Sequence, residues 1–547
     1  MKRKGTYMEQ SRKRKILKMV GFMFLLVLLF GIVLVLMISS DERWFAYLIL
    51  TACIGSLVML RRTEFWHGWR VPLCWVVALV VAWIGLFAGQ PSADIQPYTT
   101  AELEQPSASY QLLLNNLTIV DTRTGNLTSN VSILFADGKI IDIAPAGSIK
   151  ADKDMKIVDA TGKYAVPGYL NMHMHLIGEK HTSDTMDLLL ANGVTGFRQM
   201  SGSAELLKEW RSGAFTSSTD QPALLTMPSD VLTPINAPTP KIAVELVRRQ
   251  KKEGAGIIKV GGVSPDVFNA VQAEADKLNI PFEGHVLPDM DLKEVAENGF
   301  ASVEHFGINN GALISTSTDE KTLRAEATGV PSITENPIFV QFMKIKGLRD
   351  FVNEQAISLA IKTSGGKKDS AQLQHLIDTY SEEKAIELAD VYVENNTWQC
   401  LTLVRMHLGL FADGSNSIEQ ELYDLYLKLA KTFDSEGVKM MVGTDEGGGA
   451  NWRTAGYSIH QEFDELEKAD ISPLHVLQMA TLNGAEFLGR MDDMGTVEIG
   501  KNGDVVLLDE NPLESVQNLH KIDAVIRAGA YHSKEELDSI KKNAIVK

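Results

Sequence analysis

Six polar side chains that follow short apolar segments could together bind metal ions. His173 and His175 stand two residues apart in "PGYLNMHMHLIG", a segment typical of a buried strand. Because alternate side chains of a strand point to the same face, this pair can hold one ion. Four more polar side chains end similar segments farther along the chain: Lys259 in "GAGIIKVGG", His285 in "PFEGHV", His305 in "SVEHFG" and Asp445 in "VGTDEGGG". Nitrogen and oxygen donors of these kinds suit a divalent ion, zinc in particular.

The segments that carry these residues alternate with amphipathic helical stretches, a pattern typical of parallel βα units. Eight strands are expected, at residues 164–174, 194–200, 223–227, 256–260, 281–286, 302–305, 397–404 and 439–444. Eight such strands in one α/β domain favour a closed (β/α)8 TIM barrel, whose active site lies at the C-terminal ends of the strands. The six polar residues fall at those ends, so we expect them to converge.

Each residue taken alone is weak evidence. A single histidine at a strand end is usually a hydrogen-bonded structural residue, and Lys259 could pair with a buried acid or extend its stem along an apolar surface. What favours a metal site is that all six occur in barrel order, each at the C-terminal end of one of five strands. His181, His407 and His460 lack that placement, and we expect them to be surface or supporting residues.

The ends of the chain outside the barrel have different patterns. Residues 110–165 and 491–547 are rich in short strands broken by turns, which predicts one small β-sandwich built from both ends. The barrel then occupies residues 166–490, with a charged and mostly helical insertion at about 307–396. Residues 90–109 are rich in Pro, Ser, Ala and Gln and are expected to be a linker.

Residues 1–89 are expected to be a membrane region. Three apolar runs, at about 16–40, 44–60 and 71–89, approach or exceed the ~20 residues that a membrane helix needs. Lysines and arginines cluster before the first run and between the second and third, and such clusters mark the cytoplasmic side. We therefore expect a multi-pass protein of the cell membrane with its catalytic domain outside the cytoplasm.

Charge is divided along the chain in the same way. The membrane region is basic, whereas the whole chain has a formal net charge of −16, so the part after it is strongly acidic. An acidic domain of this kind argues against nucleic acid as a partner. The partners expected are the membrane and a small-molecule or short peptide substrate.

A series of motifs resembles the amidohydrolase superfamily, in particular its imidazolonepropionase-like and prolidase-like branch. The motifs are, in order, "VDATGKYAVPGYLNMHMH", "GAGIIKV", "EGHV", "VEHFG", "VGTDEG" and "SPLHVLQMATLNGAEFLGRMDDMGTVEIGKNGDVVLLDENPL". They extend over roughly residues 110–532, and the membrane region lies outside the resemblance. The resemblance implies a barrel that binds two divalent metal ions, and a β-sandwich formed by both chain ends.

The resemblance also implies a ligand set. It assigns His173, His175 and Asp445 to one metal ion, and His285 and His305 to the other. Lys259, carboxylated by carbon dioxide, would bridge the two ions through an anionic carbamate. The chain departs from the usual pattern at Asn171 and Gln199, where the family has acids, and in "GKNGD". None of these departures removes a ligand, so we expect them to affect substrate preference.

A hydroxide that bridges two divalent ions is nucleophilic near neutral pH, because metal binding lowers the pKa of water from ~15.7 to about 7. Asp445 is the expected catalytic base, which passes the proton of the water to the leaving nitrogen. The chain is thus expected to be a membrane-anchored hydrolase of an amide or peptide-like C–N bond, such as that of an Xaa-Pro dipeptide or a cyclic amide. Three alternatives stay open: a lactonase or phosphotriesterase, a single-metal site without lysine carboxylation, and a non-catalytic membrane-tethered binding or sensor module.

Overall fold

A computed structural model describes the chain from residue 107 to residue 546. Within this range it leaves out residues 214, 216–217, 328, 344–346, 350, 354, 357–369, 412–415 and 448–453. The three predicted membrane helices, at 16–40, 44–60 and 71–89, lie outside the described residues. Among the residues that are described, no helix combines the length and the apolar character that crossing a membrane requires.

The chain divides into two compact units. One unit comprises Gln96–Pro331 and Thr363–Lys547, and it contains all six predicted site residues. The other comprises Met1–Ile95 and Ser332–Lys362. The described residues of this second unit include a 3-10 helix η1 (Ser332–Glu335) and a helix α11 (Pro337–Phe342).

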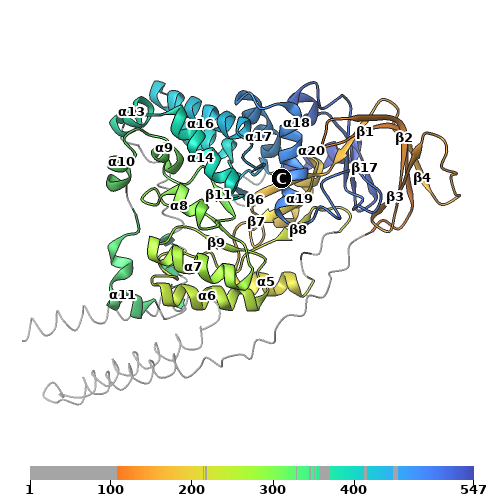
Figure 1. Cartoon of the computed structure of the whole chain (residues 1–547). Coiled ribbons are helices and arrows are strands. Elements are labelled where there is room, and N and C mark those ends of the chain that lie inside the picture. The colour runs from red at the N-terminus through yellow and green to blue at the C-terminus, as the bar shows by residue number, and fades with distance from the viewer. Residues whose placement is uncertain are drawn as a thin grey trace, which may run out of the picture. The chain divides into compact units, whose positions relative to one another are not determined.

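Strands from both ends of the described chain form one eight-stranded sheet (Figure 1). Its strands are β1 (Leu112–Val120), β2 (Leu127–Ala136), β3 (Lys139–Pro145), β4 (Lys156–Asp159), β5 (Tyr164–Pro167), β15 (Val505–Leu508), β16 (Ile522–Arg527) and β17 (Ala530–Ser533). Their order is β17-β16-β15-β5-β1-β2-β3, with β4 beside β1. The β2–β3 hairpin turns at Asp137 and Gly138, which both have positive φ as a two-residue type I′ turn requires. The apolar face of this sheet packs on its own cluster, which includes Leu114, Phe135 and Val505.

The second group of strands is parallel and carries the predicted site residues. It comprises β6 (Tyr169–His175), β7 (Val194–Gln199), β8 (Ala223–Thr226), β9 (Ile258–Val260), β10 (Phe282–Gly284), β11 (Ser302–Glu304), β12 (Trp398–Cys400), β13 (Met440–Met441) and the short β14 (Glu446–Gly447). Two curled sheets result, with the orders β13-β12-β11-β10-β9 and β14-β6-β7-β8. The predicted α/β class, with parallel strands connected by helices, is confirmed.

Backbone hydrogen bonds join the two curled sheets at both edges. The Met172 N–H donates to Val442 O at 2.8 Å, between the β6 and β13 edges. At the other edge the Gly256 N–H donates to Met227 O at 3.1 Å, and the Leu232 N–H donates to Lys259 O at 2.9 Å. The ends of all these strands therefore meet at one face.

One predicted strand, at 164–174, is in fact two. The chain passes from the eight-stranded sheet to the curled sheets at Gly168, between β5 and β6. A side chain at Gly168 would collide with Thr195 of the neighbouring strand β7, so only glycine allows this close passage.

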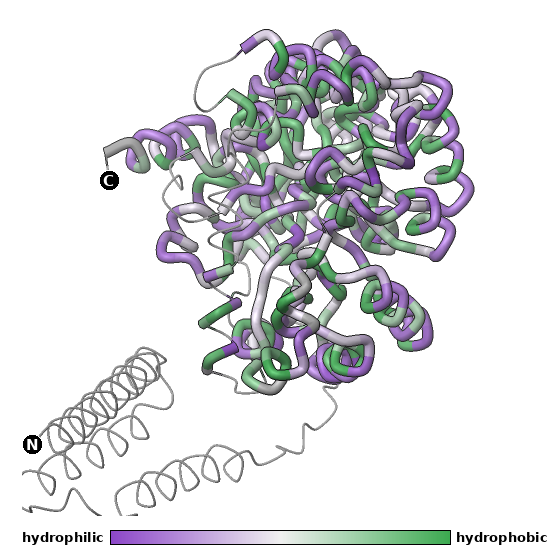
Figure 2. The backbone as a smooth tube through the Cα atoms, turned by 90° about the vertical axis from the view of Figure 1, so that its left-hand side faces the viewer, coloured by the Kyte–Doolittle hydropathy of each residue, from purple (hydrophilic) through white to green (hydrophobic). Residues whose placement is uncertain are grey.

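Helices surround the parallel strands (Figure 1). They are α4 (Thr182–Ala191), α5 (Ala204–Arg211), α6 (Pro240–Glu253), α7 (Pro265–Leu278), α8 (Leu292–Glu297), α14 (Glu382–Glu394), α15 (Leu403–Phe411), α16 (Ser417–Ser435), α17 (Tyr457–Lys468), α18 (Pro473–Ala480) and α19 (Leu482–Phe487). Apolar and polar residues alternate along these helices, as Figure 2 shows. In α6, Thr239 caps the first turn by accepting from the Ile242 N–H, and the left-handed Gly254 ends the helix. The buried face of α6 carries Leu246 and Val247.

The predicted insertion at 307–396 is mostly helical in its described part. Besides η1, α11 and α14 it contains α9 (Gly311–Ser315), α10 (Glu320–Glu326) and α13 (Ser370–Asp378). The end of the chain differs from the prediction, because a helix α20 (Lys534–Val546) follows the last strand and its Ala544 packs on Leu188 of α4.

Candidate metal centre

Five of the six predicted site residues lie against one another at the C-terminal ends of the parallel strands. The Oδ1 atom of Asp445 is 3.3 Å from His173 Nε2 and 2.9 Å from His175 Nε2, and these two nitrogens are 3.3 Å apart. The Oδ2 atom of Asp445 is 3.8 Å from His305 Nε2. The ring of His285 is 5.1 Å from that of His305, centroid to centroid. Strands β6, β10 and β11 and the segment after β13 thus deliver donor atoms to one place.

Lys259 of β9 is the sixth residue, and it is buried among these groups. Its Nζ atom has no hydrogen-bond partner among the described residues, and the side chain is 1% exposed. Burial lowers the pKa of Lys259, against the opposing charge of Glu304. Its charge in turn acts on His285, whose pKa lies well below the ordinary value because of burial and then of Lys259. Burial thus shifts the equilibrium of this amine towards its neutral form.

The backbone is strained where the site residues stand. His305, Phe306, Thr402 and Asp445 all adopt left-handed φ values, between 52° and 59°, although none is glycine. Each follows directly on a strand or lies within four residues of its end. Strain of this kind costs on the order of 1–3 kcal/mol per residue and gathers at functional sites.

Glu304 orients His173. The Nδ1 atom of His173 is 2.5 Å from Glu304 Oε2, and neither side chain is exposed. On the other side, Arg198 Nη2 donates to Glu304 Oε1 at 3.0 Å. Burial alone would raise the pKa of Glu304, but Arg198 and His173 together hold it well below its ordinary value. The carboxylate therefore keeps the proton of His173 on Nδ1, which leaves the Nε2 lone pair facing Asp445 and His175.

Arg198 joins Glu304 to a second buried acid, Glu283. Arg198 Nη1 lies 2.9 Å from Glu283 Oε1, but the two are not aligned as a hydrogen bond. Burial raises the pKa of Glu283 to about 6, against the opposing charge of Arg198. Arg198, Glu283 and Glu304 were not predicted as site residues, although their placement in the sequence is unusual. A charged residue inside a short apolar strand is costly unless it is paired, and all three lie in such strands.

A second set of potential metal ligands lies on the other side of His173. His173, Glu304 and Cys400 offer atoms within 4.8 Å of one another. Burial raises the pKa of the Cys400 thiol well above its ordinary value, which disfavours the thiolate that a metal would need. Glu304 is also occupied by Arg198. The set formed by His173, His305 and Asp445 is the better metal centre.

Asn171 and Gln199, two of the three departures from the usual pattern, make contacts beside the site. The Asn171 Nδ2–H donates to Thr444 Oγ1 at 2.9 Å, which ties β6 to the segment that carries Asp445. Gln199 Oε1 accepts from the backbone N–H groups of Leu176 and Ile177, at 2.8 and 3.1 Å. This amide therefore fixes the chain immediately after His175.

Arg405 and Thr402 add contacts that the sequence did not predict. Arg405 Nε, from the first turn of α15, lies 2.5 Å from Asp445 Oδ2. Thr402 Oγ1 lies 2.5 Å from His305 Nδ1, the ring nitrogen that faces away from Asp445. The segment from β12 to α15 thus contacts both Asp445 and His305.

The three histidines that were not predicted to be ligands contact residues outside the metal centre. His181 Nδ1 is 3.6 Å from Asp184, and His407 Nδ1 is 3.2 Å from Glu465. His460 Nε2 lies 3.1 Å from Asn192 O.

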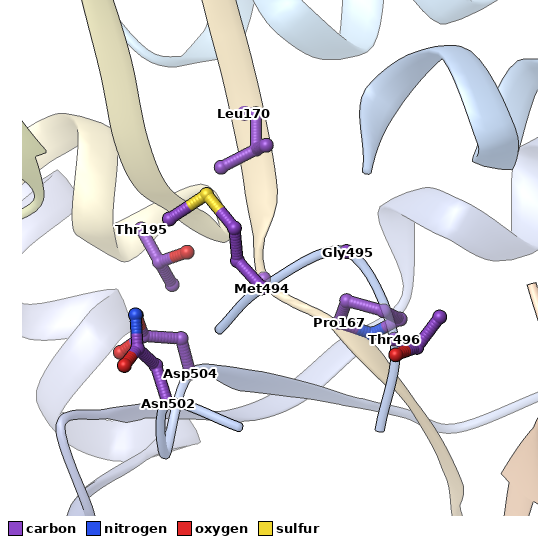
Figure 3. A pocket seen from close by; sticks show the side chains of 9 residues that line it. Pro167, Leu170, Thr195, Met494, Gly495, Thr496, Asn502 and Asp504 are labelled. Atoms are coloured by element: carbon purple, nitrogen blue, oxygen red, sulfur yellow. The ribbon is translucent and has the colours of Figure 1, made fainter. Parts of the chain in front are cut away.

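An enclosed cavity lies at the opposite end of β6 from the histidines (Figure 3). Pro167, Leu170 and Met494 line it together with the polar Thr195 and Asp504. Its volume of about 10 Å³ holds at most one water molecule. The cavity is too small for a substrate.

Parallel strands with histidines and a carboxylate at their C-terminal ends offer the donor atoms of a metal-binding site on an α/β scaffold. Comparison with known proteins gives similarities over parts of the chain. Residues 417–531 match the sequence model of the amidohydrolase family. Imidazolonepropionase of Shouchella clausii is 37% identical over 62 residues, which are 11% of this chain and 14% of that protein. Ochratoxinase of Aspergillus niger is 27% identical over 221 residues, which are 38% of this chain and 44% of that protein. The sequence alignments thus span less than half of each of these relatives.

Solved structures share the fold over a longer stretch. A Xaa-Pro dipeptidase with bound methionine superposes with a TM-score of 0.54 at 16% identity, over 77% of this chain and all of that one. The crystal structure of A. niger ochratoxinase gives a TM-score of 0.51 at 16% identity, over 78% and 96% of the two chains. The chain is thus similar to the amidohydrolase family over residues 417–531 and shares its fold with these structures.

Proposed function

We propose that the chain is a metal-dependent amidohydrolase that cleaves an amide or peptide-like C–N bond. The observation that carries the proposal is the contact of Asp445 with three histidines at the strand ends. The similarity to enzymes named for C–N bond chemistry, a Xaa-Pro dipeptidase among them, supports the same class.

The donor set fits a pair of divalent ions. His173, His175 and Asp445 would hold one ion, and His285 and His305 the other. Lys259 completes the set, because a buried amine without a hydrogen-bond partner is otherwise a costly feature. Nitrogen and carboxylate donors of this kind are those that zinc prefers.

Lys259 would enter the site as its carbamate. The neutral amine, which burial favours, attacks carbon dioxide, a new N–C bond forms and one proton leaves. The product is a carbamate, whose single negative charge is shared by two oxygen atoms. A free ammonium could not act as a ligand, whereas the carbamate of Lys259 would offer oxygen donors to the ions.

When bound, the ions supply Lewis acidity and lower the pKa of a water molecule towards 7. Asp445 would act as the base, taking a proton from the attacking water and returning it to the leaving nitrogen. Burial alone would raise the pKa of Asp445, but His173 and His305 hold it well below its ordinary value, so it starts as a carboxylate. Glu304 keeps His173 in one tautomer and orientation throughout.

We also propose that the protein is anchored in the cell membrane through residues 1–89, with the barrel outside the cytoplasm. The three apolar runs and the placement of the basic clusters support this arrangement. The chain would then act on small amides or short peptides at the cell surface.

The test is hydrolysis of a panel of amides, dipeptides, lactones and phosphotriesters by the purified zinc-loaded protein. We expect turnover of a C–N substrate by the wild type and a loss of about 10³-fold or more in Asp445→Ala, which lacks both base and ligand. Asp434→Ala is the matched control, because Asp434 also pairs with a histidine, His475, at 2.7 Å. Turnover of only lactones or phosphotriesters, or near-normal turnover in Asp445→Ala, would contradict the proposal.

A further inference from the structure

A buried carboxylate from α17 caps the helix that follows β12. Glu462 is 1% exposed, and its two oxygens accept from the backbone N–H groups of Leu403 and Val404, at 3.1 and 2.7 Å. These are the first two residues of α15. A helix cap normally comes from the residue just before the helix, whereas Glu462 lies 59 residues beyond Leu403 in the chain. Because burying a carboxylate is costly, this distant cap calls for a physical reason.

The residue that would ordinarily cap α15 is Thr402, and its hydroxyl is engaged elsewhere. Threonine is a favoured cap, because its oxygen can accept from an N–H group of the first turn. Thr402 instead has a left-handed φ of 52°, unlike the extended backbone that is usual for a cap. Its Oγ1 atom donates to Leu401 O at 2.7 Å and lies 2.5 Å from His305 Nδ1. With its proton directed to Leu401, the hydroxyl oxygen can accept from the histidine ring.

The four N–H groups of the first turn of α15 all have partners, and the Thr402 hydroxyl serves none of them. Leu403 and Val404, at 0% and 3% exposure, donate to Glu462. The next two N–H groups donate to the carbonyl oxygen of Thr402, at 3.0 and 3.2 Å. Without Glu462 the first two N–H groups would be buried and unpaired, which is unfavourable. The hydroxyl of Thr402, which directly precedes them, would then be drawn from His305 to the helix.

We propose that Glu462 is a positioning residue of the metal centre, because it caps α15 and thereby leaves the Thr402 hydroxyl for His305. The inference rests on the proposed function, in which His305 holds a metal ion. A partner on the far nitrogen of a ligating histidine fixes the orientation of the ring, and its loss weakens metal binding by about 10- to 100-fold. Removal of Glu462 should therefore act on the metal centre through Thr402, although Glu462 itself is bonded to the backbone of α15.

The experiment is a double-mutant cycle between Glu462→Ala and Thr402→Val in the full-length protein. Zinc affinity is measured by competition with a chelating dye for the wild type, each single variant and the double variant. Asn416→Ala is the matched control, because Asn416 caps the next helix, α16, by accepting from the Glu419 N–H at 2.9 Å. If Glu462→Ala does not fold, Glu462→Gln takes its place in the cycle, since glutamine keeps one acceptor oxygen.

We expect Glu462→Ala and Thr402→Val each to lose zinc affinity by about 10- to 100-fold, and the double variant to lose no more than either one. A loss that is shared in this way means that both substitutions remove the same contact with His305. Asn416→Ala should bind zinc like the wild type. Losses that multiply in the double variant, or an unchanged affinity in Glu462→Ala, would overturn the inference, because Glu462 would then not act through Thr402.

A second readout needs neither metal nor substrate. Hydrogen exchange of the metal-free protein, followed by mass spectrometry of the peptide that contains Leu403 and Val404, reports on their N–H groups. Exchange should be faster in Glu462→Ala than in the wild type, and faster still in the double variant, where Thr402 can no longer replace the lost cap. Equal exchange in Glu462→Ala and the double variant would overturn the inference. If the wild type binds no zinc, the proposed function fails, and the exchange rates still decide whether Thr402 takes over the cap.

Discussion

Replacing Glu304 with glutamine should weaken metal binding although no ligand is changed. Glu304 accepts from Arg198 Nη2 at 3.0 Å, from Ser302 Oγ at 2.8 Å and from His173 Nδ1 at 2.5 Å. A glutamine has one acceptor oxygen, so if it serves Arg198 and Ser302 its NH₂ group faces His173 Nδ1. That ring nitrogen must then accept, and the proton of His173 moves to Nε2, where the metal ion would bind.

The expected loss of zinc affinity in Glu304→Gln is about 10- to 100-fold, the usual effect of removing the partner of a ligating histidine. The loss of stability should be on the order of 3–5 kcal/mol, because Arg198 loses a buried carboxylate partner. Zinc affinity is measured by competition with a chelating dye, and stability by urea unfolding of the metal-free protein.

Glu283→Gln is the matched control for this prediction. Glu283 is equally buried and lies beside the same Arg198, but Glu304 is the acid that contacts His173. Burial raises the pKa of Glu283 to about 6, so the protonated and neutral form of Glu283 is less costly than it is for an ordinary glutamate. Zinc affinity in Glu283→Gln should therefore change far less than tenfold. Equal losses of zinc affinity in Glu304→Gln and Glu283→Gln would contradict the idea that Glu304 sets the tautomer of His173. The loss would then reflect only the removal of a negative charge near the site.

Three further predictions follow from the same contacts and from the sequence. Lys259→Ala should lose activity and bound metal, with partial recovery in added short carboxylic acids; two metal ions per chain and full unaided activity in this variant would exclude the bridging role. His460 donates from Nε2 to Asn192 O, its Nδ1 has no partner among the described residues, and burial lowers its pKa to about 3. His460 is therefore neutral in the folded protein, whereas the unfolded chain binds a proton near pH 6.5. The free energy of unfolding should fall as the pH drops from 6.5 towards 3, by about 2 kcal/mol at pH 5. Urea unfolding at pH 7 and pH 5 should show that decrease in the wild type and a smaller one in His460→Gln; the same decrease in both proteins would count against a neutral His460. Protease added to spheroplasts should degrade the barrel without lysis, whereas protection until lysis would place the barrel in the cytoplasm.

Much of the architecture could be predicted because it depends on local patterns. Short apolar segments and amphipathic helices indicated parallel βα units, and each predicted strand has a counterpart in the structure. The turn at Asp137 and Gly138 also has a local cause, because both residue types tolerate the positive φ values found there. The split at Gly168 was missed, because β5 and β6 are consecutive and equally apolar and only the packing against Thr195 separates them.

The site was predictable where a residue has a distinctive type and position, and less so where its role depends on distant partners. The residues predicted as ligands end five of the parallel strands, and the structure brings them together. Arg198 and Glu304 are 106 residues apart, so their pairing has no local signature. Arg405 was not predicted, because an arginine on an amphipathic helix has the pattern of an ordinary surface residue. Its contact with Asp445 is visible only once α15 is placed beside that residue.

If the histidines, Lys259 and Asp445 hold metal ions that hydrolysis requires, metal content and activity must change together. Both are measured on the purified chain, as bound metal and as hydrolysis of a C–N substrate, before and after chelation. We expect two divalent ions per chain in the wild type, loss of both metal and activity on chelation, and recovery of activity with added zinc. Undiminished hydrolysis by the metal-free protein would contradict the proposed role of the metal ions.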